Sequence, residues 1–114
     1  MADSRKRFEI LRARYAKSLA SKHAALAEAW RAFADAADEV RACKLQDLAH
    51  RLAGSAPAYG YATLGTRAGI VDSEIADWRD ANPNARESPG DLARRLSAPT
   101  QALIESLARL AAEA

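Results

Sequence analysis

The sequence predicts an all-α protein, built as an up-down bundle of about four helices. Apolar residues recur at steps of three and four along most of the 114 residues, which is the period of amphipathic helices. No segment alternates apolar and polar residues with the period of two that a half-buried strand would show. There is also no repeat, low-complexity tract or interdomain linker, so residues 1–114 are expected to form a single domain.

The first third of the chain is expected to be one long amphipathic helix. Asp3 or Ser4 can cap its start, and no glycine or proline interrupts it up to residue 33. Its apolar stripe consists of Phe8, Leu11, Tyr15, Leu19, Leu26, Trp30 and Phe33. The acids Asp35 and Asp38 then suit a short turn with a capping residue, so the next helix should run antiparallel to the first.

The second helix is expected from about residue 39 to residue 56, because Pro57 cannot lie deep inside a helix and Gly60 favours a turn. A third helix follows, and Asn82-Pro83-Asn84 ends it. Its stripe is Tyr61, Leu64, Ala68, Val71, Ile75 and Trp78. Ser88 and Pro89 form the N-cap and first position of a fourth helix. Its stripe is Leu92, Leu96, Leu103, Leu107 and Leu110, and Pro99 is expected to kink this helix rather than break it.

Charge and composition narrow the class of protein. The 17 basic and 15 acidic residues nearly balance, which gives no broad attraction to nucleic acid or to an anionic membrane. The basic cluster Arg5, Lys6 and Arg7 is typical of a solvated helix face. A lone cysteine, no signal-peptide pattern and no apolar run near ~20 residues together predict a soluble cytoplasmic protein, expected to be a monomer.

His50 is the residue that calls for a functional explanation. On a helical wheel with about 100° per residue, Leu45, Leu48 and Leu52 lie on the side opposite His50. A core histidine is therefore excluded on this helix, and the imidazole is expected to face solvent. Cys43, Gln46, Asp47, Ala53, Gly54 and Pro57 lie within about 60° of it. Because most of these side chains are short, a partner could approach the imidazole closely.

The run from His50 to Ala56, His-Arg-Leu-Ala-Gly-Ser-Ala, resembles the histidine phosphotransfer (HPt) domains of bacterial phosphorelays. The pattern of that family is H-x-L-K-G-S/A-S/A, followed by a glycine ten residues after the histidine and a leucine four further on, here Gly60 and Leu64. The detailed match covers about residues 45 to 72, and the four-helix layout extends it over the chain. One position departs, because Ala53 stands where the family has lysine.

The resemblance implies a phosphocarrier that takes a phosphoryl group from the phospho-aspartate of one receiver domain and gives it to another. It implies His50 as the phosphoacceptor, with response-regulator receivers and a hybrid sensor kinase as partners. The receiver would supply Mg²⁺, so the carrier itself needs no cofactor and no metal site. The residues expected to dock the partner or to lie near the phosphoryl group are Cys43, Lys44, Gln46, Asp47, Arg51, Ala53, Gly54 and Pro57.

Two other functions remain open. Ala53 suits a degenerate domain of this kind, which docks receivers or a kinase without being phosphorylated. The basic N-terminal cluster suits a helical nucleic-acid binder, although no recognition helix or stacking aromatic residues accompany it. An autonomous kinase is not expected, because the sequence has no G-x-x-x-x-G-K-[ST] loop for ATP.

Overall fold

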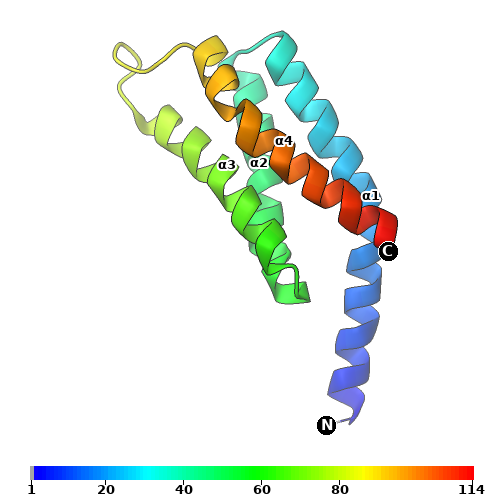
Figure 1. Ribbon diagram of the computed structural model, residues 1–114. Coiled ribbons are helices and arrows are strands. Elements are labelled where there is room, and N and C mark those ends of the chain that lie inside the picture. Colours follow the sequence, from blue (N-terminus) through cyan, green and yellow to red (C-terminus); the bar gives the residue numbers. More distant parts are fainter. Residues whose placement is uncertain (1) are drawn as a thin grey trace.

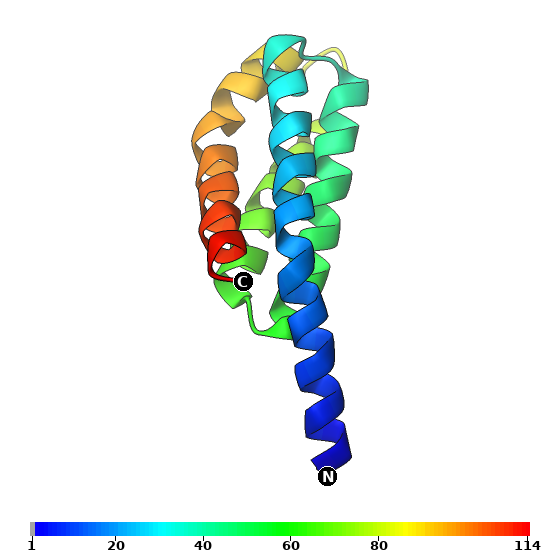
Figure 2. The same cartoon turned by 90° about the vertical axis from the view of Figure 1, so that its right-hand side faces the viewer.

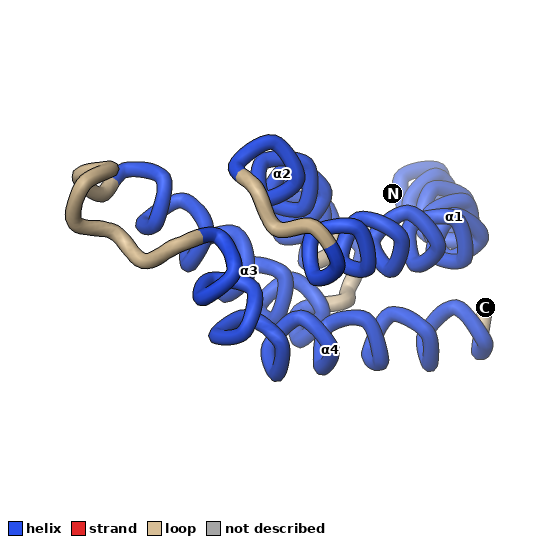
Figure 3. Tube along the Cα trace, turned by 90° about the horizontal axis from the view of Figure 1, so that it is seen from above, coloured by secondary structure: helices blue, strands red, loops and turns tan. Residues whose placement is uncertain are grey.

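Four helices running alternately up and down form the protein (Figure 1). The computed structural model describes residues 2–114, and within that range it contains no strand. The helices are α1 (Ala2–Asp35), α2 (Glu39–Ser55), α3 (Ala62–Asp80) and α4 (Pro89–Glu113). Viewed from above, they surround a shared interior, and α4 closes the ring against α1 (Figure 3). The predicted fold class is confirmed, including the long N-terminal helix.

The core is formed by the buried positions of all four helices. Its largest fully buried apolar side chains are Leu19, Leu26, Phe33, Leu45, Leu64, Val71, Ile75, Leu92, Leu96, Leu103 and Leu107. Each buried leucine or isoleucine contributes about 1.5–3 kcal/mol relative to an exposed one, so this interior is the main source of stability.

The stripe of α1 is buried only from Tyr15 onward. Phe8 and Leu11, expected on the same buried face, remain 46% and 43% exposed. The first turns of α1 extend beyond the ends of the other helices, and only the turn after α2 reaches them, through the Tyr59 ring that stacks on Phe8 (Figure 2). Helical periodicity thus indicates which face of α1 is apolar but not how far along that face the partner helices extend.

The predicted caps of α2 and α4 are present, whereas Asp3 and Ser4, expected to cap the first helix, lie inside α1, which already includes Ala2. Asp38 accepts a hydrogen bond from the backbone N–H of Arg41 at 2.8 Å, and Ser88 accepts one from that of Asp91 at 3.1 Å. The helix α4 continues through Pro99 without interruption, so a break at this proline is excluded. Its axis changes direction in its first half (Figure 2), as expected for a proline kink.

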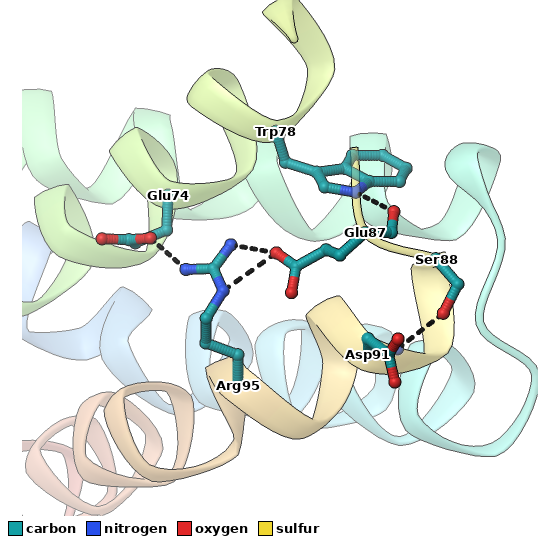
Figure 4. A network of polar contacts seen from close by, with 6 residues as sticks. All are labelled: Glu74, Trp78, Glu87, Ser88, Asp91 and Arg95. Carbon is teal, nitrogen blue, oxygen red and sulfur yellow. Dashed lines mark hydrogen bonds and ion pairs between the residues drawn. The ribbon is translucent and has the colours of Figure 1, made fainter. Parts of the chain in front are cut away.

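The connection between α3 and α4 is held by polar contacts at the top of the bundle (Figure 4). The indole N–H of Trp78 donates to the carbonyl oxygen of Glu87 at 2.8 Å. Arg95 of α4 donates to the Glu87 carboxylate at 2.9 Å and pairs with Glu74 of α3. The last residues of this connection are thus tied to both helices that it joins.

At the other end of the bundle, the turn after α2 packs on α1. It contains the short 3-10 helix η1 (Pro57–Tyr59) and Gly60, whose φ of 91° is the left-handed conformation that favours glycine. The Tyr15 and Tyr59 rings stack with their centroids 4.4 Å apart. The Tyr15 hydroxyl lies 2.7 Å from that of Ser55, and burial raises the pKa of this phenol. These contacts fix the C-terminal end of α2, the helix that carries His50.

Candidate functional site

The helix α2 presents His50 to solvent. Its imidazole side chain is 73% exposed, as the wheel predicts. The buried positions of the same helix are Ala42, Leu45, Ala49 and Leu52. An exposed imidazole on a rigid helix suits attack on a group carried by another protein, because no side chain of this chain has to move away first.

The buried face of α2 is rotated relative to the face that the leucines alone indicate. The leucines place its centre about 190° from His50, whereas Ala42 and Ala49 add positions near 270° and move the centre to about 240°. This rotation turns the His50 side of α2 toward α3. Gln46 and Ala53 are consequently half-buried at the edge of the α2–α3 interface, and His50 comes within reach of α3.

Asp72 of α3 forms the closest polar contact of His50. Its Oδ2 lies 2.9 Å from His50 Nδ1, and its side chain is only 19% exposed. An ionised carboxylate can only accept, so Nδ1 must carry the ring proton in this hydrogen bond. The second ring nitrogen, Nε2, then holds the lone pair of the neutral imidazole.

Gln46 connects this pair to a second residue of α3. Its Nε2 donates to the other oxygen of Asp72 at 3.2 Å, and its Oε1 accepts from Arg79 Nη1 at 2.7 Å. Four side chains therefore form a chain of hydrogen bonds in the order His50, Asp72, Gln46, Arg79. Because both Asp72 oxygens have partners, the carboxylate is held in one orientation.

A surface hollow of about 250 Å³ lies beside the imidazole. It is lined by Cys43, Gln46, Asp47, His50 and Arg79. The structure thus brings four of the predicted site residues together and adds an arginine. The Cys43 thiol is half-buried, and Asp47 pairs with Arg51 at 3.1 Å along α2.

Lys44 and Arg51 lie away from this hollow. Each lines a separate groove between α2 and α1, Lys44 beside Glu28 and Arg51 beside Lys22. A phosphoryl group on Nε2 of His50 would therefore not find either cation in the hollow. Both side chains lie on the side of α2 that faces α1.

Gly54 and Pro57 mark the end of the exposed face of α2. A Cβ atom added at Gly54 would meet no atom within 4 Å, so the backbone is bare one turn after His50. Pro57 packs instead on Gly65 of α3, where an added Cβ would lie 2.5 Å from the proline ring. Ala53 lies between these positions and packs partly against the core.

Asp72 and Arg79 were not predicted from the sequence as site residues. They are seven residues apart, so they occupy one face of α3, and each directly follows a core residue, Val71 or Trp78. That spacing is visible in the sequence. Their partners on α2 are not, because pairing with Gln46 and His50 depends on the axial register of two antiparallel helices.

The site combines the exposed imidazole of His50, the largely buried Asp72 carboxylate that orients this ring, and Arg79 in the wall of the adjacent hollow. Within residues 2–114 there is no group of three or more histidine, cysteine, aspartate or glutamate residues placed to hold a metal ion. None of the helices in the same range combines the length and the apolar character needed to cross a membrane.

The fold and this geometry define a four-helix bundle with a carboxylate-oriented surface histidine. Comparisons with protein-family models, with curated proteins and with solved structures found no match. The site itself and the resemblance of residues 50–56 to the HPt pattern are therefore what indicates a function.

Proposed function

We propose that this protein is a histidine phosphotransfer carrier in which His50 receives a phosphoryl group from the phospho-aspartate of a receiver domain and passes it to another receiver. The observation that supports this most directly is the hydrogen bond between His50 Nδ1 and Asp72, on an imidazole side chain that is 73% exposed. A histidine with only a packing role would not need both features.

The transfer step follows from this arrangement. The lone pair of Nε2 attacks the phosphorus atom, the bond from phosphorus to the aspartyl oxygen breaks, and the receiver regains its carboxylate. The proton on Nδ1 stays in place, so the ring gains positive charge as the N–P bond forms. The Asp72 carboxylate stabilises this charge, and the reverse sequence returns the phosphoryl group to a second receiver.

The surface around His50 suits a receiver as the partner. Gly54 leaves space for close approach one turn after His50, because a Cβ atom added there would meet no atom within 4 Å. The partner's acidic pocket and its Mg²⁺ would enclose the phosphoryl group during transfer, which is consistent with a carrier that contributes a nucleophile and an orienting carboxylate.

Incubation with radiolabelled phospho-receivers tests this function. Label should pass to the wild type in an acid-labile, alkali-stable form, as a phosphoramidate requires, and His50→Gln should abolish it while the helical circular-dichroism spectrum persists. ATP alone should give no label. Label retained by His50→Gln would refute the assignment of the acceptor.

A degenerate docking domain is the second candidate, and Ala53 supports it because the family's lysine is missing there. Such a domain would bind receivers without accepting label. Binding in a pull-down with a purified receiver, combined with no transfer from the phosphorylated form, would favour this candidate over the carrier.

A further inference from the structure

Among the residues that the structure describes, Arg79 is the only lysine or arginine in the wall of the hollow beside His50. The carboxylates near it are already engaged, since Asp47 pairs with Arg51 and Asp72 with His50 and Gln46. In residues 2–114, the structure gives the Arg79 side chain a single hydrogen bond, to Gln46 Oε1 at 2.7 Å. A guanidinium has five N–H donors, so most of the donors of Arg79 are available to another acceptor.

The present partner of Arg79 is a neutral amide oxygen. A phosphoryl group carries about −1.5 to −2 charges near neutral pH. The bond to Gln46 has one ionised partner, whereas a bond to a phosphoryl group has two and can be bidentate, which makes it the stronger of the two. A phosphoryl group placed on His50 at the edge of the same hollow would therefore compete successfully with Gln46 for this guanidinium.

We propose that Arg79 is the phosphoryl-binding cation of this protein, which contacts the group carried by His50 and replaces the lysine missing at Ala53. This inference rests on the proposed function in that it requires a phosphoryl group at Nε2. Gln46, itself fixed by its bond to Asp72, holds Arg79 at the wall of the hollow until the phosphoryl group arrives. The cation thus comes from α3 rather than from α2.

The test uses the full-length protein loaded chemically, so that no receiver is needed. The His23→Gln variant leaves His50 as the single histidine, and phosphoramidate serves as the phosphoryl donor. Phosphorus NMR then follows the second ionisation of the phosphoryl group against pH. A nearby cation favours the dianion, so Arg79→Ala should raise the proton affinity of this group about two- to fivefold, the scale of an exposed charge pair.

Three variants separate this contact from a structural effect. Arg79→Lys keeps the charge and should retain part of the wild-type behaviour. Arg109→Ala removes an equal charge from the exposed face of α4, which packs mainly on α1 and α3, and should change nothing. Ala53→Lys added to Arg79→Ala should restore the lower proton affinity.

Salt provides a further control. At about 1 M salt, where charges are screened beyond about 3 Å, the effect of Arg79→Ala on the proton affinity should shrink.

Coinciding titration curves for the wild type and Arg79→Ala would overturn the proposal, as would a failure of phosphoramidate to modify His50. The outcome is independent of the relay itself. A shift caused by Arg79→Ala in a protein that exchanges no phosphoryl group with any receiver would keep the Arg79 contact and remove the proposed function. Transfer between receivers, without any shift of the titration curve in Arg79→Ala, would support the proposed function and remove the Arg79 contact.

Discussion

The Asp72 carboxylate determines which nitrogen of His50 carries the ring proton. It accepts from Nδ1 at 2.9 Å, and its own second oxygen is held by Gln46. Fixing the tautomer directs the nucleophilic lone pair outward, toward a partner. The same carboxylate stabilises the positive ring that phosphorylation creates, so its contribution is larger in the product than in the resting protein.

Asp72→Ala is expected to slow transfer by about ten- to a hundredfold, because a hydrogen bond to a charged group is worth about 1.5–3 kcal/mol. Wild-type label should reside on Nε2, whereas the variant, free to adopt either tautomer, should carry part of its label on Nδ1. Proton–phosphorus correlation NMR distinguishes the two products. Asp77→Ala, which removes an exposed carboxylate from the same helix, provides the control. Unchanged rate and regiochemistry in Asp72→Ala would show that the carboxylate does not orient the ring.

Two glycines near His50 are expected to respond oppositely to substitution. Gly54→Leu should preserve or raise the melting temperature, since glycine costs a helix about 1 kcal/mol relative to alanine and the position is open. It should nevertheless slow transfer from a receiver by blocking the approach to His50. Rapid transfer in this variant would remove Gly54 from the docking surface.

Gly65 provides the contrast, because a Cβ there would lie 2.5 Å from the Pro57 ring and the helix would have to separate from the turn. Gly65→Ala should therefore lower the free energy of unfolding by about 1–3 kcal/mol, the usual cost of overpacking. Urea titration of both glycine variants tests the pair. A Gly65→Ala variant as stable as the wild type would mean that the turn between α2 and α3 can shift to accommodate the added methyl group without loss of stability.

At the scale of the helices, α4 carries an unusual polar residue. Thr100 is fully buried directly after Pro99, and its hydroxyl has no hydrogen-bond partner within the described residues. A buried hydroxyl without a partner costs about 1–3 kcal/mol. The helix continues in spite of this cost because the surrounding leucines of α4 are buried in the core.

Thr100→Val is expected to raise the free energy of unfolding by about 1–2 kcal/mol, because valine has nearly the same shape and lacks the hydroxyl. Thr66→Val is the matched control, since Thr66 is exposed and its hydroxyl already donates to the carbonyl of Ala62 at 3.1 Å. Chemical denaturation measures both. Destabilisation of Thr100→Val would indicate that its hydroxyl has a partner such as a buried water.

At the scale of the whole molecule, the protein consists of a packed bundle and an uncovered N-terminal arm. The arm, residues 3–14 of α1, is exposed throughout, whereas the core begins at Tyr15. Two of its residues still contact the turn after α2: Arg12 donates to the carbonyl of Tyr59 at 2.8 Å, and the Phe8 ring stacks on Tyr59 at 6.5 Å. The residues before Phe8 extend farther from the bundle (Figure 2).

Deletion of residues 2–7 is accordingly expected to change the free energy of unfolding by less than about 0.5 kcal/mol and to leave phosphotransfer intact. A longer deletion through residue 15 removes Tyr15 from the core and should destabilise the bundle strongly. Calorimetry and the receiver assay measure both effects. Because the short deletion removes Arg5, Lys6 and Arg7, it also tests nucleic-acid binding: salt-sensitive retention on DNA that the deletion abolishes would favour that function.

The sequence by itself determined the helices, the caps of α2 and α4, and the outward position of His50. These features depend on residues close together in the chain: the period of the leucines, Ser88 before Pro89, and the angle between His50 and Leu45, Leu48 and Leu52. The HPt resemblance is local in the same way, since it depends mainly on residues 50–64.

The tertiary structure alone decided what surrounds the histidine. The leucines of α2 indicate one buried face, but the small residues Ala42 and Ala49 let α3 approach and are buried as well. The centre of the buried face is therefore shifted around the helix relative to the leucines. The pairing of Asp72 with His50 and of Arg79 with Gln46 depends on the register of α2 against α3, which core packing and the turn at Pro57 establish together. The exposure of Phe8 and Leu11 was decided in the same way, because an apolar stripe is buried only where a neighbouring helix extends far enough to cover it.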